Sequence, residues 1–378
     1  MNFCKYGPVR AVFALLCVLA LLPQAVCASF ASAKENLAMQ NEHMAYLENE
    51  YYTENYTPCD ESKIASFDIA KAVNDGVKFN EVAFLGTHNS YQLKSNETYT
   101  KLYDKLGVLT FGIVDTTKTS FNMDTLTEQL ELGMRSLELD IETVVKNGET
   151  SFIVCHDPVL DNTSSCYDFE KALEDIKMWS DNNPNHLPVT IIIEPKGNIV
   201  PINGLRNFSL QYANEFDKVL AEKLGDALLT PADMMGDYES FKAMREADGW
   251  LSLGDTLGKV LVLLHDSSVT DEYINQDTTI KSQAMFPMLR YADINKSYTS
   301  FIIDNAPEEA LEHEEKSIDE CNLIVRTRAD SFPTFSDERY ENTNKCKSQI
   351  ISTDYPFKAD GTDSHIYSFD GCTVKLIK

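Results

Sequence analysis

Basic residues are scarce in this chain, and their scarcity excludes several classes of partner. The 378 residues include 33 Lys and Arg against 59 Asp and Glu, a formal net charge of −26. A field of this sign repels nucleic acid and anionic membranes, so neither is expected as a nonspecific partner. The net charge does not exclude a transient contact with a membrane surface. It also does not exclude a local basic or metal-containing site that binds an anion. We expect a monomer.

Long apolar runs are also absent, with one exception near the N-terminus. Lys5 and Arg10 precede the run Ala11–Leu22, and small residues follow it up to Ala33. This order is typical of an export signal, and the run is short for a membrane span. We therefore predict a signal peptide over residues 1–33 and a secreted, soluble mature protein. A retained signal anchor is the alternative.

No C-x-x-C pair is present, which argues against a zinc site. Three of the nine cysteines lie in or beside the predicted signal, and the other six form an even set. An even set in an exported chain predicts disulfides. The sequence leaves the pairing open, although local spacing favours Cys155–Cys166 and Cys321–Cys346, which leaves Cys59 for Cys372. In a eukaryotic host, five sequons would accept glycans: Asn55, Asn96, Asn162, Asn207 and Asn295.

Internal repeats and low-complexity blocks are absent too, so we predict one catalytic barrel domain over residues 59–378. Residues 34–58 are polar without a clear apolar repeat and are predicted to form a loose N-terminal arm. Eight mostly continuous apolar runs then follow, as in strands buried on both faces. They are residues 81–86, 136–142, 151–157, 189–196, 259–266, 300–306, 321–330 and 349–356.

Amphipathic segments fill most of the gaps between these runs. Residues 124–133, 167–179 and 208–225 have helical spacing, and 308–320 reads as a solvated helix. Alternating strands and helices predict an α/β fold, a (β/α)₈ TIM barrel. The gap between the second and third runs is too short for a helix, so we expect an irregular barrel there.

Polar residues gather where the first four runs end, at the predicted mouth of the barrel. His88 and Asn89 follow the first run, Glu138 and Asp140 lie in the second, His156 ends the third, and Glu194 and Lys196 end the fourth. Function in such barrels gathers at the carboxyl ends of strands. Because neighbours on a strand face opposite ways, His88 and Asn89 can both reach the mouth only if the chain bends there.

Glu138 and Asp140 are two residues apart, so on a strand they share one face. Two neighbouring carboxylates repel each other unless a cation or a proton lies between them. With Glu194 and the amide of Asn89 they form an oxygen-only set that suits Ca²⁺, or less well Mg²⁺, rather than zinc. The alternative is that Glu138 and Asp140 are the solvated face of an edge strand.

His88 and His156 are either structural histidines or a pair for acid–base chemistry near neutral pH. Two imidazoles, a lysine and a metal among carboxylates suit the cleavage of a phosphodiester. The cations stabilise developing negative charge, and a histidine protonates the leaving oxygen.

The segments GTHNSY, LELDIE, CHD and IIEPK, in this order and spacing, resemble the X-type catalytic barrel of phosphatidylinositol-specific phospholipase C. The resemblance is greater to its exported, single-domain, calcium-dependent branch. It covers residues from about 80 to 356, and each motif is weak alone whereas the ordered set is fairly specific.

The resemblance implies a role for each matching residue. Asn89, Glu138, Asp140 and Glu194 would bind Ca²⁺, and Glu138 is our choice of base for the inositol 2-hydroxyl. His88 would stabilise the pentacoordinate phosphorus, and His156 would protonate the departing diacylglycerol. Lys196 and Arg328 would contact phosphate or inositol, although Arg328 can instead pair with Asp330 or Asp354. The implied products are diacylglycerol and a cyclic inositol phosphate, released or hydrolysed further.

Several rival functions stay open at this point. A glycerophosphodiester phosphodiesterase uses a similar set of residues but usually opens with His-Arg-Gly, whereas Asn89, Ser90 and Tyr91 follow His88 here. Sphingomyelinase-D-like lyases are more remote. An inactive exported barrel that binds headgroups is disfavoured, because both histidines are present. A surface-interaction protein is the least supported. The acidic charge also keeps a soluble phosphodiester or a glycolipid anchor among the possible substrates.

Overall fold

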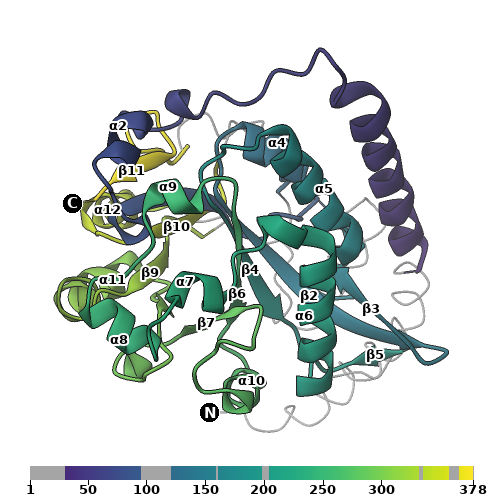
Figure 1. Cartoon of the computed structure of the whole chain (residues 1–378). Coiled ribbons are helices and arrows are strands. Elements are labelled where there is room, and N and C mark those ends of the chain that lie inside the picture. Colours follow the sequence, from purple (N-terminus) through teal and green to yellow (C-terminus); the bar gives the residue numbers. More distant parts are fainter. Residues whose placement is uncertain are drawn as a thin grey trace, which may run out of the picture.

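The computed structural model describes residues 30–94, 121–158, 161–197, 204–331, 335–356 and 366–377. Eight parallel strands close into a barrel surrounded by helices, which confirms the predicted TIM-barrel fold (Figure 1). The closure is made by β1, which pairs with β10 on one side and with β2 at Gly86 and Ser136 on the other. In order around the barrel the strands are β1 (Val82–Thr87), β2 (Ser136–Lys146), β4 (Val189–Pro195), β6 (Val260–His265), β7 (Phe286–Leu289), β8 (Phe301–Ile303), β9 (Ile324–Arg328) and β10 (Ile350–Thr353).

Three further strands lie outside the barrel, and one of them corrects a prediction. The run 151–157 was expected to be the third barrel strand, but β3 (Glu149–Val154) pairs antiparallel with β2 as a hairpin. Asn147 and Gly148 form its turn with φ values of 53° and 87°, which Asn and Gly tolerate. The missing barrel strand is β7, which no predicted run included. The other two are β5 (Leu205–Arg206), antiparallel to β2, and β11 (Val374–Leu376), antiparallel to β1.

The helices are mostly short and follow the barrel strands. The predicted segments 124–133, 167–179 and 208–225 correspond to α4 (Leu126–Glu131), α5 (Phe169–Asn182) and α6 (Leu210–Leu224). The segment 308–320 is α11 (Pro307–Glu314) continued by the π-helical η7 (Glu315–Glu320). The remaining helices are α2 (Ile69–Asn74), α7 (Pro231–Met235), α8 (Phe241–Glu246), α9 (Leu253–Thr256), α10 (Thr270–Gln276) and α12 (Asp337–Lys345), with single turns at η1 (Leu47–Tyr51), η2 (Glu61–Lys63), η3 (Phe79–Glu81), η5 (Gly225–Ala227) and η6 (Tyr291–Asp293).

The predicted loose arm at 34–58 is wrong for most of its length. Residues 30–46 form a helix that continues into η1, and the helix lies beside α5 (Figure 1). The first part of its buried face is polar, at Ser32, Asn36 and Gln40. The sequence therefore has no apolar repeat there from which the helix could be predicted. Residues 1–29 of the predicted signal lie outside the described part of the chain. None of the helices in the described part is both long and apolar enough to cross a bilayer.

The expected disulfides are not formed: all six described cysteines are free thiols. The Cys59 thiol donates to Oε2 of Glu131 at 2.9 Å, and the Cys346 thiol donates to the Thr343 carbonyl at 3.2 Å. Cys346 and Cys321 pack in one apolar cluster without bonding to each other. Asn162 cannot accept a glycan in the folded protein, because its side chain is fully buried. Asn55, Asn207 and Asn295 are exposed, and Asn96 lies outside the described residues.

Candidate active site

The inward-facing positions of the barrel strands change from apolar to polar as each strand reaches the mouth. Ile192 and Leu263 belong to the apolar cluster inside the barrel, and two residues further along their strands stand Glu194 and His265. Side chains two apart on a strand share a face, so each polar residue stands one layer above its apolar neighbour. The same step leads from Met288, Ile303 and Ile324 to Arg290, Asn305 and Arg326. These polar residues line a cavity of about 480 Å³ at the carboxyl ends of the strands.

The cavity brings together all but one of the predicted site residues. His88, Asn89, Glu138, His156, Glu194, Lys196 and Arg328 line it. Asp140 is completely buried beneath the cavity, where the Lys196 ammonium contacts it at 2.9 Å. Leu137, Leu139 and Ile141 lie in the core on the other face of β2, so the predicted division of this strand into two faces is confirmed.

His88 and Asn89 reach the same cavity because the chain bends between them and β1. The His88 N–H still donates to Thr353 on β10, at 3.1 Å, but the Ser90 N–H donates to Glu138 on β2, at 2.9 Å. At Asn89 φ is 48°, in the left-handed region that asparagine tolerates better than most residues. The predicted bend is therefore present. Gly86 is required for packing rather than for the bend, because a Cβ there would lie 2.3 Å from the Ser136 carbonyl oxygen.

The His88 imidazole is held in one orientation by a carboxylate behind it. Its Nδ1–H donates to Oδ1 of Asp354 at 2.7 Å, and since a carboxylate only accepts, Nδ1 carries the proton. Its Nε2 then faces the cavity, 3.7 Å from Oε1 of Glu138. Arg328 pairs with the other Asp354 oxygen at 3.0 Å and also lines the cavity. Of the two partners expected for Arg328, the structure selects Asp354.

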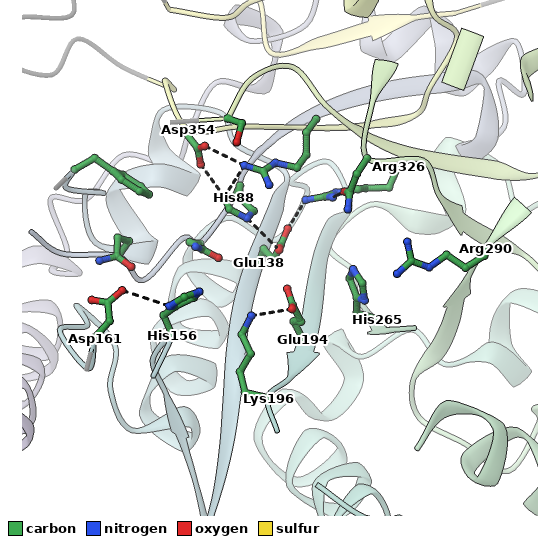
Figure 2. Close-up of a pocket in the computed structure, with 16 residues that line it drawn as sticks. His88, Glu138, His156, Asp161, Glu194, Lys196, His265, Arg290, Arg326 and Asp354 are labelled. Atoms are coloured by element: carbon green, nitrogen blue, oxygen red, sulfur yellow. Dashed lines mark hydrogen bonds and ion pairs between the residues drawn. The ribbon is translucent and has the colours of Figure 1, made fainter. Parts of the chain in front are cut away.

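Glu138, Asp140 and Glu194 form an acidic cluster whose oxygens lie within 4.8 Å of one another. Arg326 contacts Oε2 of Glu138 inside the barrel, and Lys196 lies 2.7 Å from Oε1 of Glu194 (Figure 2). Burial would raise the pKa of Glu138, but the positive charges of Arg326 and its neighbours outweigh that effect and hold the pKa at about 2. Burial would likewise lower the pKa of Lys196, and the Asp140 and Glu194 carboxylates raise it.

The acidic cluster fits a hard divalent cation. Asp140 accepts a 2.7 Å hydrogen bond from the Tyr91 hydroxyl at Oδ2, but its Oδ1 is buried without a hydrogen-bond partner. Burial, and then the nearby Glu194 and Glu138 charges, raise the pKa of Asp140 to about 7 despite Lys196. An orphaned carboxylate oxygen beside two more carboxylates and the amide of Asn89 is an oxygen-only donor set, as Ca²⁺ prefers.

His156 lies at the side of the cavity, on the segment that follows β3. Because β3 is not a barrel strand, the hairpin rather than the barrel brings His156 over the mouth. Its Nδ1 is 3.5 Å from Oδ2 of Asp161, and Figure 2 shows this pair on the opposite side of the acidic cluster from His265 and Arg290. Partial burial and the charge of Lys196 lower the pKa of His156. Burial raises the pKa of Asp161 to about 7.

A family model described as "Phosphoinositide phospholipase C, Ca2+-dependent" matches residues 143–375, more than half of the chain. The chain belongs to this phospholipase C family. No curated protein gives a significant match.

Solved structures support the same fold. The chain is similar to a calcium-dependent phosphoinositol-specific phospholipase C from Pseudomonas sp. in its myoinositol complex, with 20% identity and a TM-score of 0.58 over 84% of this chain and 99% of that one. It is also similar to a Ca²⁺-dependent phosphatidylinositol-specific phospholipase C from Streptomyces antibioticus, with 20% identity and a TM-score of 0.52 over 74% and 95% of the two chains.

Several residues that line this cavity were not predicted from the sequence. They are Asp161, His265, Arg290, Asn305, Arg326 and Asp354. The rule that inward positions recur every two residues would have found most of them, because the barrel strands β6 to β10 obey it as β2 and β4 do. Arg290, Asn305 and Asp354 stand one or two residues beyond the ends of their strands. Asp161 follows no barrel strand, and no spacing rule points to it.

Proposed function

We propose that this chain is a Ca²⁺-dependent phosphodiesterase that cleaves phosphatidylinositol, or a related inositol phosphodiester or glycolipid, to diacylglycerol and a cyclic inositol phosphate. The observation that carries the proposal is the placement of His88 and His156 in one cavity with Glu138 and Glu194, which form an acidic cluster with the buried Asp140. Lys196, Arg326 and Arg328 make this cavity a local anion site in a strongly acidic protein. Its position at the barrel mouth suits a bulky lipid headgroup.

Asn89, Glu138, Asp140 and Glu194 would hold the cation. When bound, Ca²⁺ supplies positive charge that stabilises the phosphate and makes the inositol 2-hydroxyl more acidic. Lys196 keeps Asp140 and Glu194 in place, through contacts of 2.9 and 2.7 Å.

Glu138 would accept the proton of the 2-hydroxyl as that oxygen bonds to phosphorus. With a pKa of about 2, Glu138 is fully ionised at neutral pH and is a weak base, so it needs an acidified hydroxyl. The Nε2–H of a protonated His88 would stabilise the pentacoordinate phosphorus, because Asp354 engages the other ring nitrogen. Lys196 and Arg328 would contact the phosphate or the inositol.

His156 would act as the general acid. As the bond between phosphorus and the diacylglycerol oxygen breaks, the Nε2 proton of the protonated His156 passes to that oxygen, which leaves as an alcohol, and the imidazole becomes neutral. Asp161 faces Nδ1 and so leaves Nε2 for the substrate. The imidazole side chain is 48% exposed, on the solvent side of the cavity, where a lipid leaving group has room to depart.

We further infer that the protein is exported, on the strength of the leader-like run Ala11–Leu22, and that the exposed Asn55, Asn207 and Asn295 accept glycans in a host that attaches them.

The experiment that tests the proposal compares two soluble diesters, glycerophosphoinositol and glycerophosphocholine. Attack by the inositol 2-hydroxyl requires the inositol ring, so only the first is turned over if the proposal is correct. A glycerophosphodiester phosphodiesterase would release glycerol 3-phosphate from both. His156→Ala should slow turnover about 10²- to 10⁴-fold. His313→Ala should leave turnover unchanged, because His313 lies outside the cavity lining.

A further inference from the structure

The helix formed by residues 30–46 buries polar side chains where a surface helix usually buries apolar ones. Ser32, Asn36 and Gln40, each four residues apart, are 2%, 4% and 1% exposed. Only beyond them does the buried face become apolar, at Met44 and Leu47. Buried amides need hydrogen-bond partners, so the surface that they cover must supply backbone donors and acceptors.

That surface is the segment 161–168, which follows the His156 loop. The side-chain amide of Asn36 donates to the Asn162 carbonyl at 2.5 Å. The Gln40 side chain donates to the Asp168 carbonyl at 3.0 Å and accepts from the Asp168 N–H at 2.7 Å. The two amides therefore bind both ends of the segment through its backbone.

The other side of the same segment rests on the chain that leaves β1. The Thr163 hydroxyl donates to the Leu93 carbonyl at 2.7 Å, and the Ser165 N–H donates to the Tyr91 carbonyl at 2.9 Å. Residues 161–166 are all buried between these two supports. The segment is therefore fixed by hydrogen bonds on both sides, and its Cys166 belongs to the apolar core.

Asp161, the first residue of the segment, connects it to the site. Its backbone exchanges two 3.0 Å hydrogen bonds with Asp157, the residue after His156, and its carboxylate faces Nδ1 of His156 at 3.5 Å. Asn162, which Asn36 binds, is the next residue. A shift of the segment would therefore disturb the placement of Asp161 and of the imidazole that it faces.

We propose that Asn36 and Gln40 are positioning residues for the reaction, which hold segment 161–168 so that Asp161 orients His156 for proton transfer. This inference rests on the proposed function of His156. Neither amide lines the cavity, so neither is a catalytic residue. Helix 30–46 lies outside the residues that the family model matches, whereas His156 and segment 161–168 lie within them.

A leaving-group comparison separates this role from a general structural one. Diacylglycerol is a poor leaving group and needs the proton of His156. In inositol p-nitrophenyl phosphate the leaving group departs as a stabilised phenolate and does not need it. Loss of orientation at His156 should slow the first substrate about 10- to 100-fold, within the range of general acid catalysis, and leave the second nearly unchanged.

The variants are Asn36→Ala and Gln40→Ala, with Asn36→Asp as a change of similar shape that replaces the amide donor by a carboxylate. Asn41→Ala is the matched control, because this exposed amide of the same helix contacts Lys171 on α5 rather than segment 161–168. We expect the first three to lose turnover of phosphatidylinositol selectively, and Asn41→Ala to lose neither activity. The thermal unfolding transition of each variant, compared with that of the wild type, checks that the variant is folded.

Equal loss on both substrates, or no loss on either, would overturn the inference. His156→Ala distinguishes this failure from failure of the proposed function. If His156→Ala shows the selective loss and the amide variants do not, the helix has no positioning role. If His156→Ala itself shows no selective loss, His156 is not the general acid.

Discussion

The carboxylate of Asp354 lies directly behind His88, with 2.7 Å between its Oδ1 and Nδ1 of the imidazole. The two residues follow neighbouring parallel strands, β1 and β10, and Arg328 holds the other Asp354 oxygen at 3.0 Å. The contact fixes which ring nitrogen carries a proton and which faces the cavity. His88 is therefore positioned by the closure of the barrel, where the first and last of its parallel strands meet.

Asp354→Asn should lower kcat about 10- to 100-fold, the usual cost of losing a group that orients a site residue. The amide cannot offer the negative charge that holds both His88 and Arg328. Steady-state hydrolysis of phosphatidylinositol with Ca²⁺ measures the effect. Asp370→Asn, at an exposed aspartate near the C-terminus, is the control and should match the wild type. Equal kcat in Asp354→Asn would show that His88 needs no such partner.

Ca²⁺ should raise the thermal stability of the wild type, and Asp140→Asn should remove most of that rise. Ligand at about 100 times its Kd adds roughly 2.7 kcal/mol to the free energy of unfolding. The pKa of Asp140 is raised to about 7, so replacing it by a neutral isostere costs the fold little without the ion. Differential scanning calorimetry with Ca²⁺ and with chelator provides the test, and Asp237→Asn is an exposed control. If both variants keep the full Ca²⁺ response, Asp140 is not a ligand.

The barrel could be predicted because most of its strands are continuous apolar runs. The errors in the predicted strands and helices have physical causes. β3 is as apolar as a barrel strand, and only the turn at Asn147 and Gly148 marks it as half of a hairpin. β7 is four residues long and contains Pro287, so it has too little pattern to recognise. Helix 30–46 was missed because Asn36 and Gln40 bury amides where an apolar stripe is expected.

His186 should make the fold sensitive to mild acid. Its buried ring packs against Trp179, its Nδ1–H donates to the Leu187 carbonyl, and its Nε2 accepts from the Ser180 hydroxyl. Burial, despite the Leu187 carbonyl, lowers its pKa to about 4. The unfolded chain therefore binds a proton near pH 6.5 that the folded state refuses, so stability is present above that pH and is lost as pH falls toward 4.

The expected loss from His186 between pH 7 and pH 5 is about 2 kcal/mol of unfolding free energy. Urea unfolding of the wild type and of His186→Gln at both pH values measures it. The variant should be less stable at pH 7 but should lose about 2 kcal/mol less on acidification. An identical loss in the two proteins would mean that His186 is protonated in the folded state.

All six described cysteines should react with a thiol reagent in denaturant without prior reduction. The structure contains them as free thiols, and burial raises the pKa of Cys155 and of Cys166, which keeps them unreactive in the folded state. Mass spectrometry of the alkylated protein counts the labels. A pair that is labelled only after reduction would restore the disulfide that the even cysteine count suggested.

Site residues were predicted where they belong to a motif at a strand end. Site residues that stand alone at a strand end were missed, although they occupy equivalent positions in the barrel. Glu138 and Asp140 can be recognised from the sequence because they are two carboxylates, two residues apart, in an otherwise apolar strand. Arg326 stands among polar neighbours in β9, and nothing local shows that it enters the barrel to meet Glu138. Asp161 depends on a hairpin and a loop, whose path only the folded chain defines.

The most direct test of the account follows the phosphorus of phosphatidylinositol by ³¹P NMR, with Ca²⁺ and with chelator. With Ca²⁺ the wild type should produce a cyclic inositol phosphate. His156→Ala should slow this production about 10²- to 10⁴-fold, and chelator should stop it. Turnover that is unchanged both by chelator and by His156→Ala, or the absence of any turnover by the wild type with Ca²⁺, would contradict the account.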